Sequence, residues 1–276
     1  MSADCLRWLW TTGARSRGRL DACFRSVWTT LLIFYAFVSA ILALVIFTVF
    51  LYWRGAKTLG LALPSGLEAF RMIGIGIALA CFSGGIRILA ICGVSTLAPD
   101  RLGPWFFGGE PNELIVFHPR PIAAVLVRGV LFVVLAPLLE ELVFRGWAFR
   151  RWNRSWGFLP AALASSALFA AIHYDTALIG PFVFGLVACK VYQESGNLLS
   201  PLLVHCTFNL TSMVVSIAFL EDGVRNVQDM TMLYWNLLPA GIVALVVGGG
   251  ISVWILVRRD KMLSTMNGPL ASPPAP

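Results

Sequence analysis

The sequence predicts an all-α fold, a polytopic transmembrane helical bundle of about seven to eight spans. Three observations support this prediction. Hydrophobic residues make up 58% of the 276 residues, and only 13% are charged, which is about half the share in an ordinary soluble domain. The mean hydropathy is +0.79. The apolar residues form continuous runs and do not alternate with polar ones, which excludes a transmembrane β-barrel. A soluble enzyme and a disordered chain are excluded by the same composition.

The excess of basic residues indicates membrane lipids as partners. The formal net charge is +7, and basic residues gather in short cytoplasmic loops where they contact anionic headgroups. No motif typical of nucleic-acid binding is present, so we expect no nucleic-acid partner. The six cysteines form no C-x-x-C pair, which argues against a disulfide framework and a thiolate zinc site.

The chain divides into five segments. Residues 1–26 form an Arg-rich cytoplasmic or interfacial segment, 27–121 hold the N-terminal spans and a loop, 122–220 the core helices, 221–257 a final loop and span, and 258–276 a basic, Pro-rich tail expected to be disordered. Apolar runs long enough to predict spans lie at about 28–53, 69–98, 122–144, 158–173, 177–193, 198–220 and 234–257.

Basic clusters predict the orientation of the bundle. The clusters at 150–154 and 258–261 are expected in the cytoplasm. A count of seven spans then puts the Arg-rich N-terminus outside, which the same rule disfavours. Either an eighth span lies within 66–121 or the N-terminus departs from the rule. In both cases we expect a multi-pass integral protein of the cell membrane.

Two adjacent carboxylates lie inside one of these apolar runs. Glu140 and Glu141 point about 100° apart on a helix. Arg145 lies one turn after Glu141, in the order that favours an ion pair. Glu140 has no such partner in its own helix, and an unpaired carboxylate in an apolar site suits a general base. Pro137 lies one turn earlier and is expected to leave the Val133 carbonyl without its usual donor.

Two further polar groups lie in later apolar runs. His173 follows Phe169 by four residues, and Asn209 follows His205 by four. Each group alone is also explained by hydrogen bonds between helices. Counted in both directions from the turn at 153–157, Glu141 and His173 are expected at depths along the bundle that agree within about 6 Å. His205 is expected to be shallower, so helix tilt is needed to bring it to the others.

In this order, the motifs resemble those of the CAAX prenyl endopeptidase and bacteriocin-processing family, also called the Abi or CPBP family of intramembrane proteases. The motifs are E-E-x-x-x-R from Glu140 to Arg145, F-x-x-x-H from Phe169 to His173, and H-x-x-x-N from His205 to Asn209. The resemblance covers about 122–220, so these residues are expected to form a CAAX-protease-like catalytic core.

The resemblance implies an intramembrane endopeptidase. Glu140 would activate a water molecule together with His173, His205 and Asn209 would hold the oxyanion, and Glu141 and Arg145 would orient the site. The implied substrate is a membrane-associated or lipidated peptide or protein, cleaved nearer the cytoplasmic side. No Ser or Cys nucleophile is required, and Ser165, Ser166 and Cys206 are interpreted as small packing residues.

Two questions stay open at this point. Glu140, His173 and His205 are ligand types that zinc accepts, but there is no H-E-x-x-H motif, and the glutamate mechanism works without a metal. No cofactor is therefore assigned. The alternative functions are a non-catalytic immunity or scaffold protein of the same fold and a proton-coupled transporter with Glu140, His173 and His205 as the relay.

Overall fold

The computed structural model describes residues 60–102, 122–173, 178–220 and 227–258, together with Val45 and Val49. Every regular element within these residues is helical, as predicted. The segment 1–26, the predicted span at 28–53 apart from Val45 and Val49, most of the loop at 99–121 and nearly all of the tail lie outside the described residues.

The first described helix, α3 (Gly66–Leu97), confirms the apolar run predicted at 69–98. It begins at a reciprocal cap: Ser65 N–H donates to the Glu68 carboxylate at 2.8 Å, and Glu68 N–H donates to Ser65 Oγ at 3.4 Å. This arrangement satisfies two backbone donors that a helix start would leave unpaired. A single 3₁₀ turn, η2 (Pro99–Arg101), follows the helix.

A long helical run extends from residue 122 to residue 156 and carries the two adjacent glutamates. Its parts are α5 (Ile122–Gly129), η3 (Val130–Leu135), α6 (Ala136–Glu141), η4 (Leu142–Phe149) and α7 (Arg150–Trp156). Both η3 and η4 are π-helices, and they flank the short α6. The run is longer than the predicted 122–144. The reversal expected at 153–157 is confined to Gly157, which has a φ of 79° that favours glycine.

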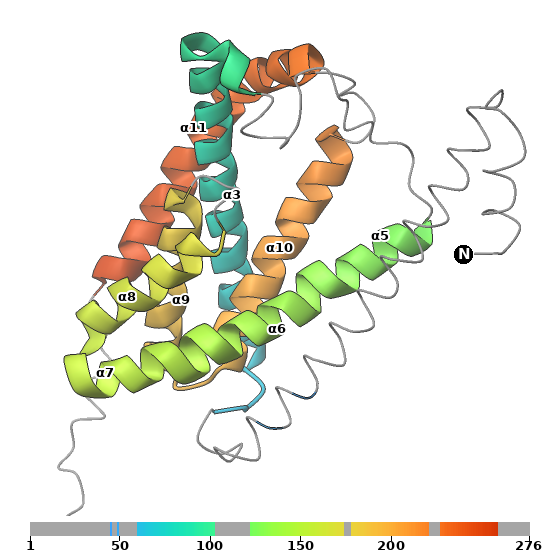
Figure 1. Cartoon of the computed structure of the whole chain (residues 1–276). Helices are drawn as coiled ribbons and strands as arrows, with labels where there is room; N and C mark the ends of the chain where they lie inside the picture. Colours follow the sequence, from blue (N-terminus) through green and yellow to red (C-terminus); the bar gives the residue numbers. More distant parts are fainter. Residues whose placement is uncertain are drawn as a thin grey trace, which may run out of the picture.

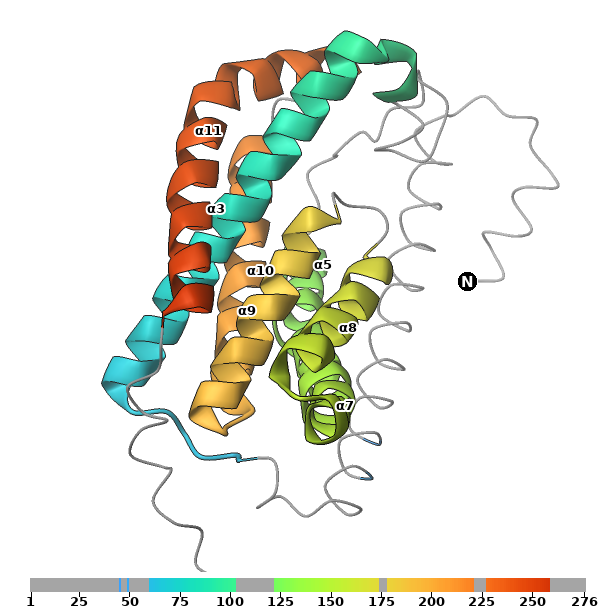
Figure 2. The ribbon, with the colours of Figure 1, turned by 90° about the vertical axis from the view of Figure 1, so that its left-hand side faces the viewer.

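The remaining helices follow in order: α8 (Phe158–Ala171), α9 (Ile179–Ser195), α10 (Leu199–Leu220) and α11 (Val227–Val257). These confirm the runs predicted at 158–173, 177–193, 198–220 and 234–257. α3 packs along α11 and α10, while α8 packs along α9. Figure 1 shows the long run lying obliquely across α9 and α10, and Figure 2 views the same run nearly end-on. Its π-helices and α6 are in contact with these two helices.

Three of the described helices are long and apolar enough to cross a membrane: Gly66–Leu97, Leu199–Ala218 and Gln228–Val257. Large apolar side chains along them are exposed, for example Phe70 and Val246. Exposed apolar side chains along helices of this length are typical of a lipid-facing protein. The structure therefore supports an integral membrane protein, whereas the full count of seven to eight spans stays a prediction.

Close contacts between helices depend on particular glycines. A Cβ atom at Gly76 of α3 would lie 2.7 Å from the Val204 carbonyl oxygen and 2.7 Å from Thr207 Cβ, both in α10. A Cβ atom at Gly185 of α9 would lie 2.7 Å from Ser166 Cβ in α8. Such small residues let helix backbones approach closely in a membrane. They set the spacing of α10 and α9 around the site described below.

Gly76→Ala is expected to lower the free energy of unfolding by about 1–3 kcal/mol, because the added methyl overlaps the α10 backbone. Gly74→Ala is the matched control, since a Cβ there meets no described atom within 4 Å. It is expected to be neutral or to stabilise α3 by up to about 1 kcal/mol through helix propensity. Denaturation of both purified variants in the same detergent measures the difference. Equal stability of the two would show that the α3–α10 contact is not tight.

Candidate active site

The two glutamates lie at the end of α6, in the middle of the long helical run. Glu141 is completely buried, and its Oε1 accepts a hydrogen bond from Arg145 Nη1 at 2.8 Å. The predicted pairing one turn apart is therefore observed. Glu140 points elsewhere, and its side chain keeps 23% of its surface exposed. The adjacent carboxylates thus lie in different surroundings, as the sequence predicts.

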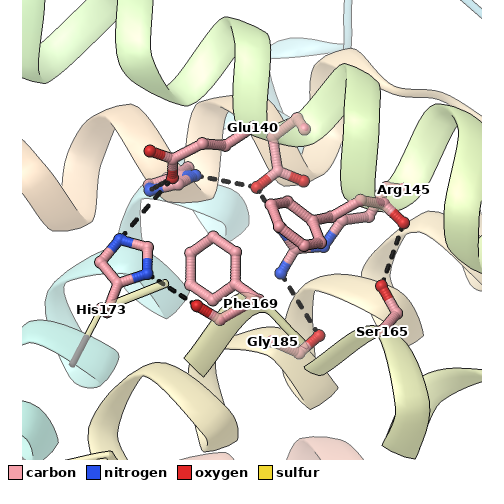
Figure 3. A network of polar contacts seen from close by, with 9 residues as sticks. Glu140, Arg145, Ser165, Phe169, His173 and Gly185 are labelled. Atoms are coloured by element: carbon pink, nitrogen blue, oxygen red, sulfur yellow. Dashed lines mark hydrogen bonds and ion pairs between the residues drawn. The ribbon is translucent and has the colours of Figure 1, made fainter. Parts of the chain in front are cut away.

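Arg145 is fully buried against two aromatic rings that stack on each other. Its guanidinium carbon lies 4.8 Å from the ring centre of Phe169 in α8 and 5.4 Å from that of Phe184 in α9. Its Nη2 also reaches the Gly185 carbonyl at 3.5 Å. Figure 3 shows Arg145, Phe169 and Gly185 in this arrangement. These contacts from two other helices hold the guanidinium in place, so it fixes Glu141 in turn.

His205 of α10 lies close to both carboxylates. Its Nδ1 is 2.8 Å from Glu141 Oε1, and its Nε2 is 3.6 Å from Glu140 Oε2. The histidine is 2% exposed. The sequence predicts a shallower position for His205 along α10. The long run crosses α10 obliquely, and this brings the glutamates to the depth of His205 (Figure 1).

His173, just beyond the end of α8, completes the group around Glu140. Its Nε2 lies 3.9 Å from Glu140 Oε2, and its Nδ1 lies 2.8 Å from the Phe169 carbonyl oxygen. Figure 3 shows His173 between Glu140 and this carbonyl. The side chain of His173 is 31% exposed. Glu140 and His173 therefore form the accessible side of the site, whereas Glu141, Arg145 and His205 form its buried side.

The hydrogen-bond partners require a proton on Nδ1 of each imidazole. A carbonyl only accepts, so Nδ1 of His173 must donate to Phe169. Glu141 Oε1 already accepts from Arg145, so Nδ1 of His205 donates to it. Each Nε2 is then the ring nitrogen that faces Glu140 Oε2, at 3.9 Å for His173 and 3.6 Å for His205.

Asn209, one turn after His205, lies on the same side of α10. Its Nδ2 donates to the Phe132 carbonyl in η3 at 2.7 Å. Because that carbonyl can only accept, the amide orientation is fixed, and one N–H remains for another partner. The side chain is 6% exposed. All six predicted site residues are thus brought to one region where the long run, α8 and α10 meet.

The ligand types of Glu140, His173 and His205 fit zinc. The geometry does not: in the described part of the chain, no three His, Cys, Asp or Glu side chains are grouped so that they could hold a metal ion. The distances of 3.6 and 3.9 Å from Glu140 to the two imidazoles are longer than the roughly 3.3 Å between ligands of a tetrahedral zinc with 2.0–2.1 Å bonds. We therefore assign no step to a metal.

Sequence reasoning did not single out several residues that contact this network. Phe184 lies with its ring centre 4.5 Å from that of His205. Ser165, interpreted from the sequence as a packing residue, donates to the Phe144 carbonyl at 3.0 Å (Figure 3). A serine or phenylalanine in an apolar helix gives no local signal of such a role, because both residues are common in transmembrane packing.

Comparisons with known proteins support the resemblance that the motifs indicated. Residues 122–211 match the family model described as type II CAAX prenyl endopeptidase Rce1-like. An uncharacterized 24.3 kDa protein of Escherichia coli is 33% identical over 102 residues, which cover 35% of this chain and 47% of that protein. The chain thus matches about half the length of this curated relative. No solved structure matches the chain significantly. The segment that holds all six site residues is therefore similar to the Rce1-like type II CAAX prenyl endopeptidases.

Proposed function

We propose that the chain is an intramembrane endopeptidase that hydrolyses a peptide bond with a water molecule activated by Glu140 and His173. The observation that carries the proposal is the convergence of Glu140 Oε2 with the Nε2 atoms of His173 and His205, at 3.9 and 3.6 Å. A water molecule beside Glu140 Oε2 donates a proton to it, and His173 aligns the water's oxygen lone pair for attack. The match to a protease family model over 122–211 supports the same conclusion.

The first chemical step begins with Glu140 as the general base. The water oxygen attacks the scissile carbonyl carbon while its proton passes to Glu140, and His173 holds the water in line. Electrons of the carbonyl double bond move to oxygen and form an oxyanion. The partial exposure of Glu140 and His173 gives the substrate access to this side of the site.

His205 and Asn209 stabilise the oxyanion in this proposal. When both of its nitrogens are protonated, His205 keeps Nδ1–H on Glu141 and offers Nε2–H to the reacting oxygen. Asn209 offers the N–H that is not bound to Phe132. Donors that are already oriented in a water-poor site stabilise developing charge without a cost of reorganisation. Glu141 and Arg145 keep His205 oriented through the chain of 2.8 Å contacts.

The second step returns the proton. As the carbonyl re-forms, the bond from carbon to nitrogen breaks, and the proton held by Glu140 passes to the leaving nitrogen. The products are a new carboxylate and a new amine, so one water molecule is consumed. No covalent intermediate with the protein is required.

The proposed substrate is a membrane-associated or lipidated peptide. The helices around the site expose apolar side chains, so a peptide anchored in the bilayer reaches Glu140 and His173 without leaving the membrane. Glu140 lies ten residues before Arg150 in the same helical run. If Arg150 and its neighbours lie in the cytoplasm, cleavage takes place on that side of the membrane.

Cleavage of membrane-anchored peptides by the wild-type protein in proteoliposomes tests the proposal. A panel of peptides with and without a farnesyl group is incubated with the protein, and the products are identified by mass spectrometry. We expect cleavage that a zinc chelator leaves unchanged. The Cys206→Ala variant, which removes the thiol next to His205, is expected to stay within about twofold of wild type, because the mechanism uses no thiol nucleophile.

Three outcomes would contradict the proposal. Loss of activity with the chelator and recovery with zinc would indicate a metal mechanism. Loss of activity in Cys206→Ala would indicate a thiol nucleophile. Absence of cleavage for every peptide, combined with proton-driven uptake into the vesicles, would favour a transporter.

A further inference from the structure

The two π-helices flank the catalytic glutamates, and each presents a backbone carbonyl to a polar side chain of another helix. In η3, the Phe132 carbonyl accepts from Asn209 of α10 at 2.7 Å. In η4, the Phe144 carbonyl accepts from Ser165 of α8 at 3.0 Å. π-Helices are rare and occur frequently at functional sites. Two of them on either side of a six-residue α6 call for a common explanation.

The register of η3 leaves the Phe132 carbonyl without a backbone donor. The N–H of Ala136 donates to Leu131, five residues back, and so bypasses Phe132. The next residue, Pro137, has no N–H to donate. Neither position that normally serves this carbonyl is therefore available, and Asn209 supplies the donor. The sequence predicts the same loss one residue later, at Val133, because an α-helical register was assumed there.

The helices held by these two bonds are the ones that carry the histidines. Asn209 lies one turn after His205 on α10, and Ser165 lies eight residues before His173 on α8. Phe132 precedes Glu140 by eight residues, and Phe144 follows it by four. Each bond thus lies within about two helical turns of the contact between a histidine and Glu140. It restricts both sliding and rotation of the histidine-bearing helix.

We propose that the Phe132 and Phe144 carbonyls are anchor points that align the two histidine-bearing helices with Glu140, with Ser165 and Pro137 as positioning residues. Ser165 sets the position of His173 through α8. Pro137 keeps the Phe132 carbonyl free for Asn209 and so sets the position of His205 through α10. The effect on catalysis rests on the proposed function, whereas the effect on histidine positions does not.

Ser165→Ala tests the α8 anchor, with Ser166→Ala as a matched control. Both serines are buried, but Ser166 Oγ has no hydrogen-bond partner among the described residues. Ser165→Ala is expected to lower kcat about tenfold, the equivalent of one hydrogen bond, with KM changed less than twofold. Ser166→Ala is expected to stay within about twofold of wild type. In a His173→Gln background, Ser165→Ala is expected to have no further effect on kcat, since it acts through His173.

Pro137→Ala tests the α10 anchor, with Pro239→Ala in α11 as a control for removing a proline from a helix. The new N–H at 137 can donate to the Phe132 carbonyl and compete with Asn209. We expect kcat to fall about tenfold for Pro137→Ala and to stay near wild type for Pro239→Ala. In an Asn209→Ala background, Pro137→Ala is expected to change kcat little.

The ring resonances of ¹⁵N-labelled histidine, recorded in nanodiscs, give a measurement that does not depend on activity. Ser165→Ala is expected to shift the signals of His173, and Pro137→Ala those of His205, while both control variants leave them unchanged. Equal spectra and equal kcat for each variant and its control would overturn the anchor proposal. Shifted spectra together with an inactive wild type would refute the protease function and retain the anchors.

Discussion

Glu140→Gln is expected to lower kcat for peptide cleavage by about a hundred- to ten-thousandfold, the usual contribution of a general base. The substitution keeps the shape of the side chain but removes its ability to take a proton from water. Because Glu140 is partly exposed and makes no contact shorter than 3.6 Å with either histidine, the fold is expected to tolerate the amide. The measurement is the initial rate of product formation in proteoliposomes, with thermal unfolding of the same sample as a check on folding.

Glu194→Gln is the matched control for this variant. Glu194 is also a partly buried glutamate within reach of basic side chains, since it pairs with Lys190 and Arg258 at 3.2 and 2.8 Å. It lies near the end of α9, outside the group around Glu140. We expect its rate to stay within about threefold of wild type, because this ion pair joins α9 to the end of α11 and makes no contact with Glu140. Similar rates for Glu140→Gln and wild type would remove Glu140 from the mechanism.

Arg145→Leu is expected to lower the free energy of unfolding by about 3–5 kcal/mol, the largest effect on stability that we predict. Removal of the guanidinium leaves the Glu141 carboxylate fully buried, with His205 as its remaining partner. It also removes the charge stacked against Phe169 and Phe184. Equilibrium denaturation in detergent measures the loss.

Two comparisons separate the buried charge from the loss of side-chain volume. Arg258→Leu breaks an ion pair of the same 2.8 Å length whose arginine side chain is 38% exposed, and it is expected to cost less than about 1 kcal/mol. The double variant Arg145→Leu with Glu141→Leu removes both charges and is expected to regain most of the stability, because no unpaired charge remains buried. If Arg145→Leu proved as mild as Arg258→Leu, the buried pair would not stabilise the fold.

Local sequence spacing was sufficient to predict the contacts that lie within one helix. The pair of Glu141 and Arg145 forms because residues four apart are neighbours on a helix surface, and it is observed at 2.8 Å. The contact of His173 with the Phe169 carbonyl also joins residues four apart, but the spacing alone did not predict it. The runs of apolar residues likewise predicted most helices within a few residues. Gly157 and Gly196, both with positive φ, mark two of the reversals between them.

The register of the long run could not be read from the sequence. The sequence prediction assumed α-helical geometry and therefore assigned the effect of Pro137 to the Val133 carbonyl. In the structure, the Ala136 N–H donates to the Leu131 carbonyl. The carbonyl that Pro137 leaves without a backbone donor is therefore that of Phe132. The difference is only one residue, but it decides which carbonyl Asn209 meets. A π-helix is stabilised by tertiary contacts such as this one, and it has no dependable local signal.

The sequence by itself determined the membrane class, the helical segments, the adjacent glutamates and the three motifs, because hydrophobic runs and spacings of four residues are properties of single helices. Only the tertiary structure decided that His173 and His205 meet at Glu140 and that their Nδ1 atoms are occupied by Phe169 and Glu141. Convergence of this kind depends on the angles and distances between helices. Those are set by close contacts such as Gly76 against Val204 and Gly185 against Ser166, which join residues far apart in the chain and leave no periodic pattern in it.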